Sequence, residues 1–363
     1  MKYRAEPAHE HGRAARTAVM LVNLGTPEAA TPSALRRYLA EFLSDPRVVE
    51  IPRLVWLPIL HGIILRTRPA KSAAKYASIW TPEGSPLKLW TEKQAKLLRG
   101  HLGQRGHDVL VSHAMRYGAP SIATQLTALK AEGASRVLVL PLYPQYSGTT
   151  TASACDAVAS WVQQTRQVPE LRFVNRYHDD PSYIEALAKR ISTHWMAHGR
   201  PERLVLSFHG VPKRVLALGD PYHCECHKTA RLLAQRLGLN PREVVVSFQS
   251  RFGKAAWLQP YTEPTLRQLA KSGVKRVDVA CPGFVSDCLE TLEEIAHAGR
   301  TAFLTAGGSE FHYIECLNDL PEWIAALGQI ALRHLSGWPT QSAADAAMLA
   351  EQKARAMAMG ARA

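Results

Sequence analysis

The sequence predicts an α/β protein of two similar lobes, each built on a parallel sheet. Apolar runs that end in Gly or Pro alternate with amphipathic stretches along the chain, which is typical of parallel α/β architecture. Three short patterns also occur twice, in the same order in each half. With 363 residues, the chain is long enough for two domains that each bury a core.

Six apolar runs are predicted to be strands, over 18–23, 109–113, 136–141, 204–208, 244–248 and 276–281. Helices are expected over much of 32–42, 88–102, 121–131, 182–198, 228–237, 263–271, 289–298 and 321–335. The sequence then becomes rich in Ala, Gln and Met. The last residues, 336–363, are therefore expected to form a loosely ordered or helical tail.

The repeated patterns define the two lobes. They pair Leu21-Val-Asn-Leu-Gly25-Thr-Pro27 with Leu206-Ser-Phe-His-Gly210-Val-Pro212, Val109-Leu-Val-Ser112 and Arg116-Tyr117-Gly118 with Val244-Val-Val-Ser247 and Arg251-Phe252-Gly253, and Gly133-x-x-Arg136-Val-x-Val-x-Pro141 with Gly273-x-x-Arg276-Val-x-Val-x-x-Pro282. Ligands bind at the carboxyl ends of strands in open parallel sheets, so these turns are expected to face a shared cleft. The predicted organisation is a polar N-terminal tail over 1–16, lobes over 17–175 and 176–310, a helical segment over 311–335 that closes on the lobes, and the tail over 336–363.

Composition excludes several classes of protein. A content of 46% hydrophobic and 21% charged residues fits a folded globular chain and excludes a disordered or collagen-like one. The longest apolar run, 54–65, is interrupted by Pro58, His61 and Gly62 and falls short of the roughly 20 residues of a membrane-spanning helix. The N-terminus lacks a signal-peptide pattern and the six cysteines do not suggest a disulfide scaffold, so a cytoplasmic protein with free thiols is expected.

The net charge of +13 is concentrated in residues 51–110, which hold ten Lys and Arg against three Asp and Glu. Such an excess fits nucleic acid, a membrane surface or an acidic small substrate. The chain has no Cys/His finger spacing, aromatic RNA-binding signature or basic heptad region, so no nucleic-acid partner is expected. A solvated helix face also accounts for the cations of 88–105.

Two turns of the second half carry side chains with acid–base or metal-binding chemistry. His209 follows the predicted strand 204–208, at the position that Leu24 occupies in the first half. Asp287, Glu290 and Glu294 follow the strand 276–281 and are spaced to share one helix face. An imidazole and a carboxylate at two strand ends suit a proton-handling pair or a divalent metal site. The structural alternatives are a hydrogen-bonded strand-end histidine and acids that interact with a helix dipole.

Six separated motifs then occur in order: Leu21-Val-Asn-Leu-Gly-Thr-Pro27, Gly84-Ser-Pro-Leu-Lys-Leu-Trp90-Thr91, Leu142-Tyr-Pro-Gln-Tyr-Ser147, Ser207-Phe-His-Gly-Val-Pro212, Trp257-Leu-Gln-Pro260 and Phe284-Val-Ser-Asp-Cys-Leu-Glu290-Thr-Leu292. From about residue 17 to 335, the chain resembles the bacterial type of ferrochelatase. The resemblance implies two Rossmann-like lobes around a porphyrin cleft. It also implies insertion of Fe²⁺ into protoporphyrin IX to give protohaem and two protons, the last step of haem synthesis.

The resemblance further implies roles for individual residues. His209 and Glu290 match the catalytic residues and iron ligands, with Asp287 and Glu294 as an accessory acidic path. The porphyrin and its propionates are expected to lie against Leu24, Arg68, Tyr76, Ser85, Arg116, Tyr117 and Trp257. Arg66 fits the position of Arg68 almost as well.

Two sites are affected by departures from family or metal-binding patterns. Animal ferrochelatases hold a [2Fe-2S] cluster with C-terminal cysteines and one cysteine at the position of Gly148; no cysteine follows Cys316 here, so no such cluster is expected. The string His223-Cys224-Glu-Cys226-His227 looks like a metal site. Ligands so close together rarely surround a tetrahedral ion, so this is the less favoured reading.

Alternatives to the ferrochelatase function remain. A chelatase of the same fold could act on coproporphyrin III or another tetrapyrrole, such as sirohydrochlorin with cobalt. A non-enzymatic haem-binding protein would leave His209 and Glu290 without a joint role, and a nucleotide oxidoreductase lacks its phosphate-binding motif. The apolar run 54–65 precedes Arg66, Arg68 and Lys71, which suits a cleft lip for an apolar dianion and peripheral contact with an anionic membrane.

Overall fold

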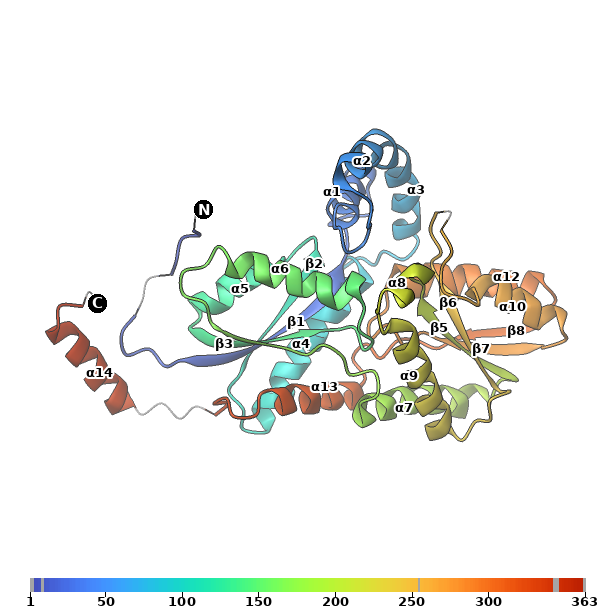
Figure 1. The fold of residues 1–363 in the computed structure, drawn as a ribbon. Coiled ribbons are helices and arrows are strands. Elements are labelled where there is room, and N and C mark those ends of the chain that lie inside the picture. Colours follow the sequence, from blue (N-terminus) through green and yellow to red (C-terminus); the bar gives the residue numbers. More distant parts are fainter. Residues whose placement is uncertain (1–2, 8–9, 254, 342–345, 362–363) are drawn as a thin grey trace.

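The structure, a computed structural model, describes residues 3–7, 10–253, 255–341 and 346–361. Two parallel sheets of four strands lie side by side (Figure 1). Their strand orders are β2-β1-β3-β4 and β6-β5-β7-β8, so the second sheet repeats the topology of the first. The predicted α/β fold of two similar lobes is confirmed.

The six predicted strands are all present, and each sheet gains one short edge strand. The first sheet contains β1 (Arg16–Gly25), β2 (Leu110–Tyr117), β3 (Ala134–Pro141) and β4 (Glu170–Phe173), and the second contains β5 (Arg203–His209), β6 (Val244–Gln249), β7 (Arg276–Ala280) and β8 (Glu310–Tyr313). β4 and β8 were not predicted, because each has only four residues and mixes charged with apolar side chains. The predicted boundary at residue 310 therefore falls inside the second sheet, since 311–313 belong to β8 rather than to a helical segment.

Helices cover both faces of the sheets. The first half contains α1 (Pro32–Leu43), α2 (Arg53–Ile59), the π-helical segment η1 (Leu60–Ile64), α3 (Leu65–Ala77), α4 (Pro86–Gln104), α5 (Ile122–Ala131), the π-helical segment η2 (Gly148–Ala152) and α6 (Ser153–Val162). The second half contains α7 (Pro181–His198), α8 (Lys213–Ala217), α9 (Tyr222–Leu237), α10 (Thr262–Lys271), α11 (Leu289–Thr291), the π-helical segment η3 (Leu292–Gly299), α12 (Arg300–Thr305), α13 (Pro321–His334) and α14 (Ala346–Ala358).

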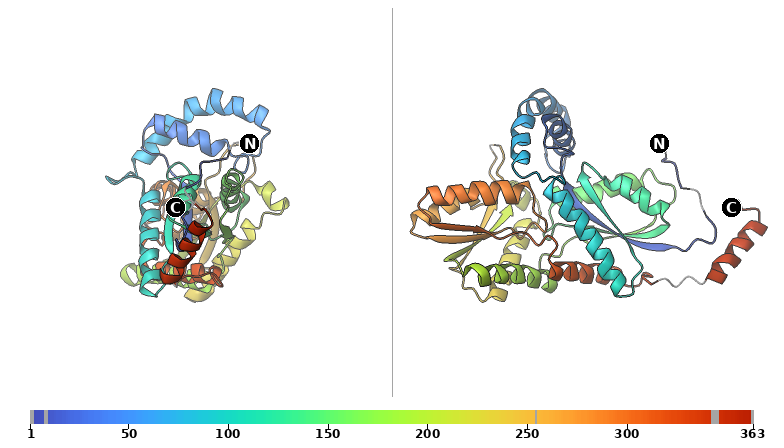
Figure 2. Two further views of the ribbon diagram at one scale, coloured as in Figure 1. Left: turned by 90° about the vertical axis from the view of Figure 1, so that its left-hand side faces the viewer. Right: turned by 180° about the vertical axis from the view of Figure 1, so that it is seen from behind.

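The two halves of the chain exchange helices, which joins the lobes. α7 follows the last strand of the first sheet but packs on the second lobe against α9, whereas α13 follows the last strand of the second sheet and packs on α4 of the first (Figures 1 and 2). α7 and α13 also contact each other. Tyr177, Tyr183 and Trp323 pack ring against ring at this junction, with centroids 5.6–6.1 Å apart. The lobes therefore share one core, which gives a fixed frame to the cleft between them.

The chain after α13 stays attached to the first lobe for several residues. Trp338 is buried in the core, and its indole N–H donates to Glu170 Oε1 at 2.7 Å. The amide of Asp108 donates to the carbonyl oxygen of Thr340 at 2.7 Å. α14 follows and buries none of its residues. Within the predicted terminal tails, residues 1–2, 8–9, 342–345 and 362–363 lie outside the described residues.

The segment from α1 to α3 forms a helical arch that stands above the two sheets (Figures 1 and 2). The sequence predicted α1 and the apolar run after it but not α2 or α3, because Pro58 and Pro69 suggest breaks and here lie inside these two helices. The arch has its own apolar core, to which Leu35, Leu60 and Tyr76 belong. Among the residues described, no helix combines the length and apolarity needed to cross a membrane.

Candidate functional site

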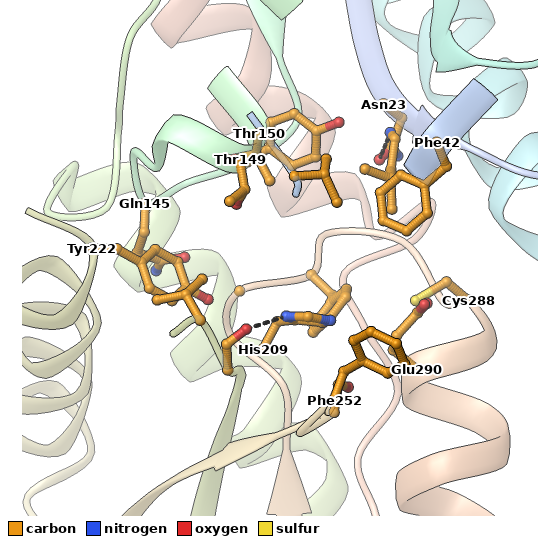
Figure 3. A pocket seen from close by; sticks show the side chains of 18 of the residues that line it. Asn23, Phe42, Gln145, Thr149, Thr150, His209, Tyr222, Phe252, Cys288 and Glu290 are labelled. Atoms are coloured by element: carbon orange, nitrogen blue, oxygen red, sulfur yellow. Dashed lines mark hydrogen bonds between the residues drawn. The ribbon is translucent and has the colours of Figure 1, made fainter. Parts of the chain in front are cut away.

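A cavity of about 320 Å³ lies between the lobes, where the carboxyl ends of the two sheets meet (Figure 3). Both lobes and the helical arch contribute to its lining, which includes Leu24, Phe42, Leu43, Val48, Val49, Arg68, Leu142, Gln145, Thr149, Thr150, His209, Tyr222, Phe252, Trp257, Phe284, Val285, Cys288 and Glu290. More than half of these side chains are Leu, Val, Phe or Trp, and Arg68, His209 and Glu290 add groups that can carry charge. This combination and size are typical of a small-molecule site.

His209 is the last residue of β5 and lies in the lining of the cavity. Its Nδ1 is 2.6 Å from the carbonyl oxygen of Gly210. Because a carbonyl only accepts, Nδ1 carries the proton of the neutral ring and Nε2 keeps a lone pair that can accept a proton or bind a cation. The turn requires glycine at position 210, since a Cβ there would lie 2.7 Å from the carbonyl oxygen of Gln249.

Glu290 reaches the same cavity from α11. Its backbone carbonyl accepts a hydrogen bond from Gln249 Nε2 at 2.7 Å, and Ser207 Oγ fixes the other end of that amide. In the part of the chain that the structure describes, no Lys or Arg forms an ion pair with its carboxylate. Burial, and then the charge of Glu290, raise the pKa of the adjacent Cys288 thiol. Cys288 therefore stays protonated and hydrogen-bonds to the Glu290 side chain, which has no cationic partner among the described residues and so can receive a cation or a proton.

Asp287 and Glu294 do not line this cavity. Asp287 is buried, where Thr291 Oγ1 donates to its Oδ1 at 2.9 Å and Asn318 Nδ2 to its Oδ2 at 2.6 Å. The carboxylate of Glu294 accepts from the amide and hydroxyl of Ser250 at 2.6 and 2.5 Å. The three acids do not share a regular helix face, because the helix begins only at Leu289 and becomes π-helical at Leu292. Asp287 and Glu294 therefore hold neighbouring turns in place.

Three of the expected porphyrin contacts, Leu24, Arg68 and Trp257, line the cavity. Leu24 lies at the end of β1, equivalent to His209 at the end of β5. The Arg68 guanidinium lies over the Phe252 ring, 4.2 Å from its centroid, and burial lowers its pKa. Among the described residues Arg68 has no carboxylate partner, so its donors remain available to an anionic ligand.

Tyr76 and Ser85 line a smaller cavity of about 10 Å³ that adjoins the first one at Glu290. Thr26 Oγ1 donates to Ser85 Oγ at 2.8 Å, and Tyr38 donates to the carbonyl oxygen of Gly25 at 3.1 Å. Burial, followed by the charge of Glu290, raises the pKa of Tyr76, which keeps its hydroxyl protonated. This cavity has about the volume of one water molecule, and hydroxyl-bearing side chains line it together with Glu290.

Arg116 and Tyr117 are engaged behind the wall of the main cavity rather than in it. Both donate to Asp45 Oδ2, from Arg116 Nη2 at 2.6 Å and from the Tyr117 hydroxyl at 2.8 Å. The Tyr117 ring meets that of Phe42 edge to face, with centroids 5.0 Å apart. Phe42 lines the cavity, so this cluster supports the wall from behind.

Known proteins provide an independent comparison. The sequence profile of the Ferrochelatase family matches residues 16–335. The chain belongs to the ferrochelatase family. It is 72% identical to the ferrochelatase of Methylibium petroleiphilum (strain ATCC BAA-1232 / LMG 22953 / PM1) over 363 residues, which is the whole of both chains. It is 66% identical to that of Polaromonas sp. (strain JS666 / ATCC BAA-500), with 99% of this chain and 100% of the relative covered.

A solved structure of SirB from Bacillus subtilis with Fe³⁺ shares the fold, with a TM-score of 0.54 and 14% identity over 88% of this chain and 96% of that one. The likeness extends to both lobes and agrees with the chelatase architecture. Membership of the ferrochelatase family makes this protein a metal-chelating enzyme with ferrous iron as its substrate metal. The cavity between the lobes is thus its candidate active site.

Asp45→Asn is expected to destabilise this ferrochelatase by about 3 kcal/mol, because it leaves the partly buried Arg116 without its counter-charge. Burial pushes the pKa of Asp45 up, but hydrogen bonds from Ser153, Arg47 and Tyr117 and the Arg116 charge hold it below its ordinary value. Because the folded pKa of Asp45 is lowered, its carboxylate stabilises the folded protein at pH values above the unfolded pKa of about 3.9. This contribution to the free energy of unfolding is lost as the pH falls through the folded pKa.

Urea unfolding of the wild type and of Asp45→Asn at pH 7 and pH 3.5 checks this prediction. The difference between their free energies of unfolding should be smaller at pH 3.5. Asp156→Asn is the matched control, because Asp156 pairs with Arg47 at the exposed surface, where an ion pair contributes about 0.5 kcal/mol. Equal losses for the two variants would show that the buried pair adds nothing.

Several lining residues were not singled out from the sequence. A signal existed for Tyr143 and Gln145, which lie in the ferrochelatase motif 142–147, and for Phe252, which lies in the internal repeat. Val48 and Val49 carry no such signal, because only the packing of the helical arch brings them to the cavity. η2 contributes Thr149 and Thr150, and η3 begins two residues after Glu290; π-helical segments are frequent at functional sites.

The string His223-Cys224-Glu-Cys226-His227 forms the start of α9, which begins six residues before the predicted helix at 228. Cys226 is fully buried and Cys224 is exposed, so the two thiols point to different surroundings. The His223 and His227 ring centroids are 4.5 Å apart, with the ring planes tilted by 52°. Among the residues described, this string does not bring three ligand atoms together.

Proposed function

We propose that this ferrochelatase inserts Fe²⁺ into protoporphyrin IX, forming protohaem and releasing two protons, with His209 and Glu290 as its catalytic residues and iron contacts. One observation carries the assignment: a ring nitrogen with a free lone pair and an unpaired carboxylate enter the same largely apolar cavity. The apolar walls suit a macrocycle, and the two polar groups suit its metallation.

The chemistry uses both groups. Each Fe²⁺ that enters the ring replaces two pyrrole N–H protons. We assign the first transfer to His209 Nε2, because its partner Nδ1 is held as a donor to Gly210. Glu290 balances the charge of the incoming cation. An imidazole and a carboxylate bind ferrous iron less firmly than thiolates do, which suits a site that passes its metal on. The protonated Cys288 beside Glu290 does not compete as a ligand.

The wall opposite His209 bends the ring in this proposal. Leu24 and Phe42 approach from the first lobe, and the exchanged helices hold the lobes in place. A porphyrin held out of plane exposes the nitrogen lone pairs that a flat ring directs inward. Contacts around the periphery of the ring then stabilise a geometry closer to the transition state. Asp287 and Glu294 act by positioning the Glu290 turn and the Ser250 loop.

Arg68→Ala is expected to raise the KM for porphyrin about tenfold with little change in kcat, because Arg68 binds a propionate before and during insertion. Initial rates over a range of porphyrin concentrations check this expectation. Arg66→Ala is the matched control, since Arg66 is exposed on the same helix and does not line the cavity. A KM that rises equally in both variants would mean that Arg68 acts only through general charge.

The deciding experiment supplies purified protein anaerobically with Fe²⁺ and either protoporphyrin IX or coproporphyrin III, and follows the metalloporphyrin absorbance. Faster metallation of protoporphyrin supports the proposal. Exclusive metallation of coproporphyrin would show that protoporphyrin IX is not the substrate, while the proposed chelatase activity would stand. Porphyrin or haem binding without any metallation would favour a non-enzymatic binding protein instead.

We also propose that the helical arch rests on an anionic membrane surface, where apolar porphyrins partition. Leu54 is 92% exposed and Ile63 is 58% exposed on α2 and η1, and the exposed Arg66 and Lys71 follow. Apolar side chains beside cations are the composition of an interfacial anchor.

Arg66→Ala with Lys71→Ala is therefore expected to weaken binding to phosphatidylserine vesicles about tenfold or more, at about 1 kcal/mol for each cation removed. Co-sedimentation with vesicles measures the effect, with neutral phosphatidylcholine vesicles as the reference. Lys88→Ala serves as the control, because Lys88 is an exposed cation of α4 outside the arch. Unchanged binding in the double variant would remove the membrane proposal and leave the active-site proposal intact.

A further inference from the structure

Three histidines meet on the second lobe, outside the cavity. His194 and His198 lie on α7, and His312 lies on β8. One ring nitrogen of each lies within 4.8 Å of the others. In the ranges that the structure describes, this is the one group of three or more His, Cys, Asp or Glu side chains arranged so closely. None of the three lines the cavity between the lobes.

We propose that these histidines form a second metal site, for a divalent transition-metal ion such as Zn²⁺ or Co²⁺, separate from the site of iron insertion. The two histidines of α7 are four residues apart and so share one helix face. Their ring centroids are 4.5 Å apart with the ring planes tilted by 36°, and both rings contact the His312 ring edge to face. Neutral imidazole is a ligand that suits this class of ion.

The separation of two ring nitrogens fits a shared ion. His194 Nε2 and His312 Nδ1 are 3.1 Å apart. Two nitrogens bound to one tetrahedral Zn²⁺ at about 2.0–2.1 Å are separated by about 3.3 Å. The pair thus needs only a slight adjustment, while rotation of the more exposed His198 brings in the third nitrogen. Without an ion, one proton bridges the two rings.

A carboxylate orients His312 as a ligand. Glu310 Oε1 is 2.8 Å from His312 Nε2 and can only accept, so Nε2 carries the ring proton. The lone pair of the neutral ring is then on Nδ1, the atom that faces His194. A carboxylate that holds the far nitrogen of a histidine is the usual support of a metal ligand.

The charges around the cluster also favour a cation. Asp278 is fully buried, with its Oδ2 3.7 Å from His194 Nε2, and Glu310 adds a second carboxylate. Arg276 opposes them, with its Nε 3.4 Å from Asp278 Oδ1 and its Nη1 3.3 Å from Glu310 Oε1. Two carboxylates thus face one guanidinium.

His198 is exposed, so the ion can enter from solvent and keep a water as its fourth ligand. Its binding would fasten the edge strand β8 to α7.

The test is a titration of the full-length protein with Co²⁺, followed by visible absorption. The double variant His209→Ala, Glu290→Ala removes binding at the proposed insertion site, so the experiment does not depend on that proposal. We expect this variant to keep one equivalent of Co²⁺, displaced by Zn²⁺ but not by Mg²⁺. Further substitution of His198→Ala or His312→Ala should weaken binding at least 100-fold.

His227→Ala is the matched control, because His227 is also exposed and its ring contacts a histidine four residues away, while the described residues place no third ligand beside this pair. Binding should be unchanged in this control. Melting curves with and without Zn²⁺ give a second measurement, and only proteins with the intact cluster should be stabilised. The proposal is overturned if the double variant binds no Co²⁺, or if its binding survives the loss of both His198 and His312.

Discussion

His209→Ala is expected to lower kcat for iron insertion by about 10²- to 10⁴-fold, the range over which a positioned general base contributes. In the proposed mechanism this variant loses the ring nitrogen that accepts the proton, whereas it keeps the apolar side chains that line the cavity. Porphyrin affinity, measured by quenching of protein fluorescence, should change little. Stopped or continuous absorbance assays at saturating porphyrin and Fe²⁺ isolate kcat from KM.

Leu24→Ala is the matched control, because Leu24 occupies the equivalent strand end of the first lobe and lines the same cavity. We expect it to alter porphyrin KM more than His209→Ala does, with a smaller loss of kcat. A His209→Ala variant that keeps kcat within about threefold of the wild type would mean that proton transfer needs no imidazole at this strand end.

The predicted fold followed from features that depend on local sequence. Central strands such as β1 and β5 are buried on both faces, so they read as continuous apolar runs. The edge strand β8 does not, because half of it is polar and its pairing with β7 is decided by the rest of the sheet. Helices α2 and α3 of the arch were not predicted for a related reason: Pro58 and Pro69 lie in helices whose stability comes from packing.

The parts of the candidate site that could be predicted are single side chains that follow a predicted strand. His209 and Glu290 both lie in the cavity that the internal repeat implied. The register of the acids after Glu290 was not predictable, because a π-helical segment changes which side chains share a face. Arg116 was assigned to porphyrin, but Asp45, which is 71 residues away along the chain, takes up its guanidinium.

The histidine cluster likewise combines a feature of the local sequence with one that depends on tertiary structure. The spacing of His194 and His198 on a predicted helix was visible in the sequence, and it indicates two ligands on one face. The third ligand depends on β8, whose position beside β7 is a property of the whole sheet. A complete metal site is therefore a tertiary feature even when two of its ligands follow a local rule.

Glu290→Gln is expected to lower kcat about 100-fold or more at saturating porphyrin, because the amide keeps the shape of the side chain but removes its charge. The loss should be accompanied by a higher KM for Fe²⁺, since Glu290 is the one carboxylate among the described residues that line the cavity. Stability should be unchanged or slightly higher. Among the described residues no Lys or Arg pairs with Glu290, so the substitution leaves no counter-charge exposed.

Glu293→Gln is the control, because Glu293 is three residues away and pairs with Lys75 at 2.9 Å instead of lining the cavity. It should keep kcat within about twofold. Combined with His209→Ala, the Glu290 substitution should cost less than the product of the two separate losses, because residues that act on one proton and one cation act as a unit. Losses that multiply would instead place His209 and Glu290 in independent steps, with iron delivery by Glu290 complete before the imidazole accepts a proton.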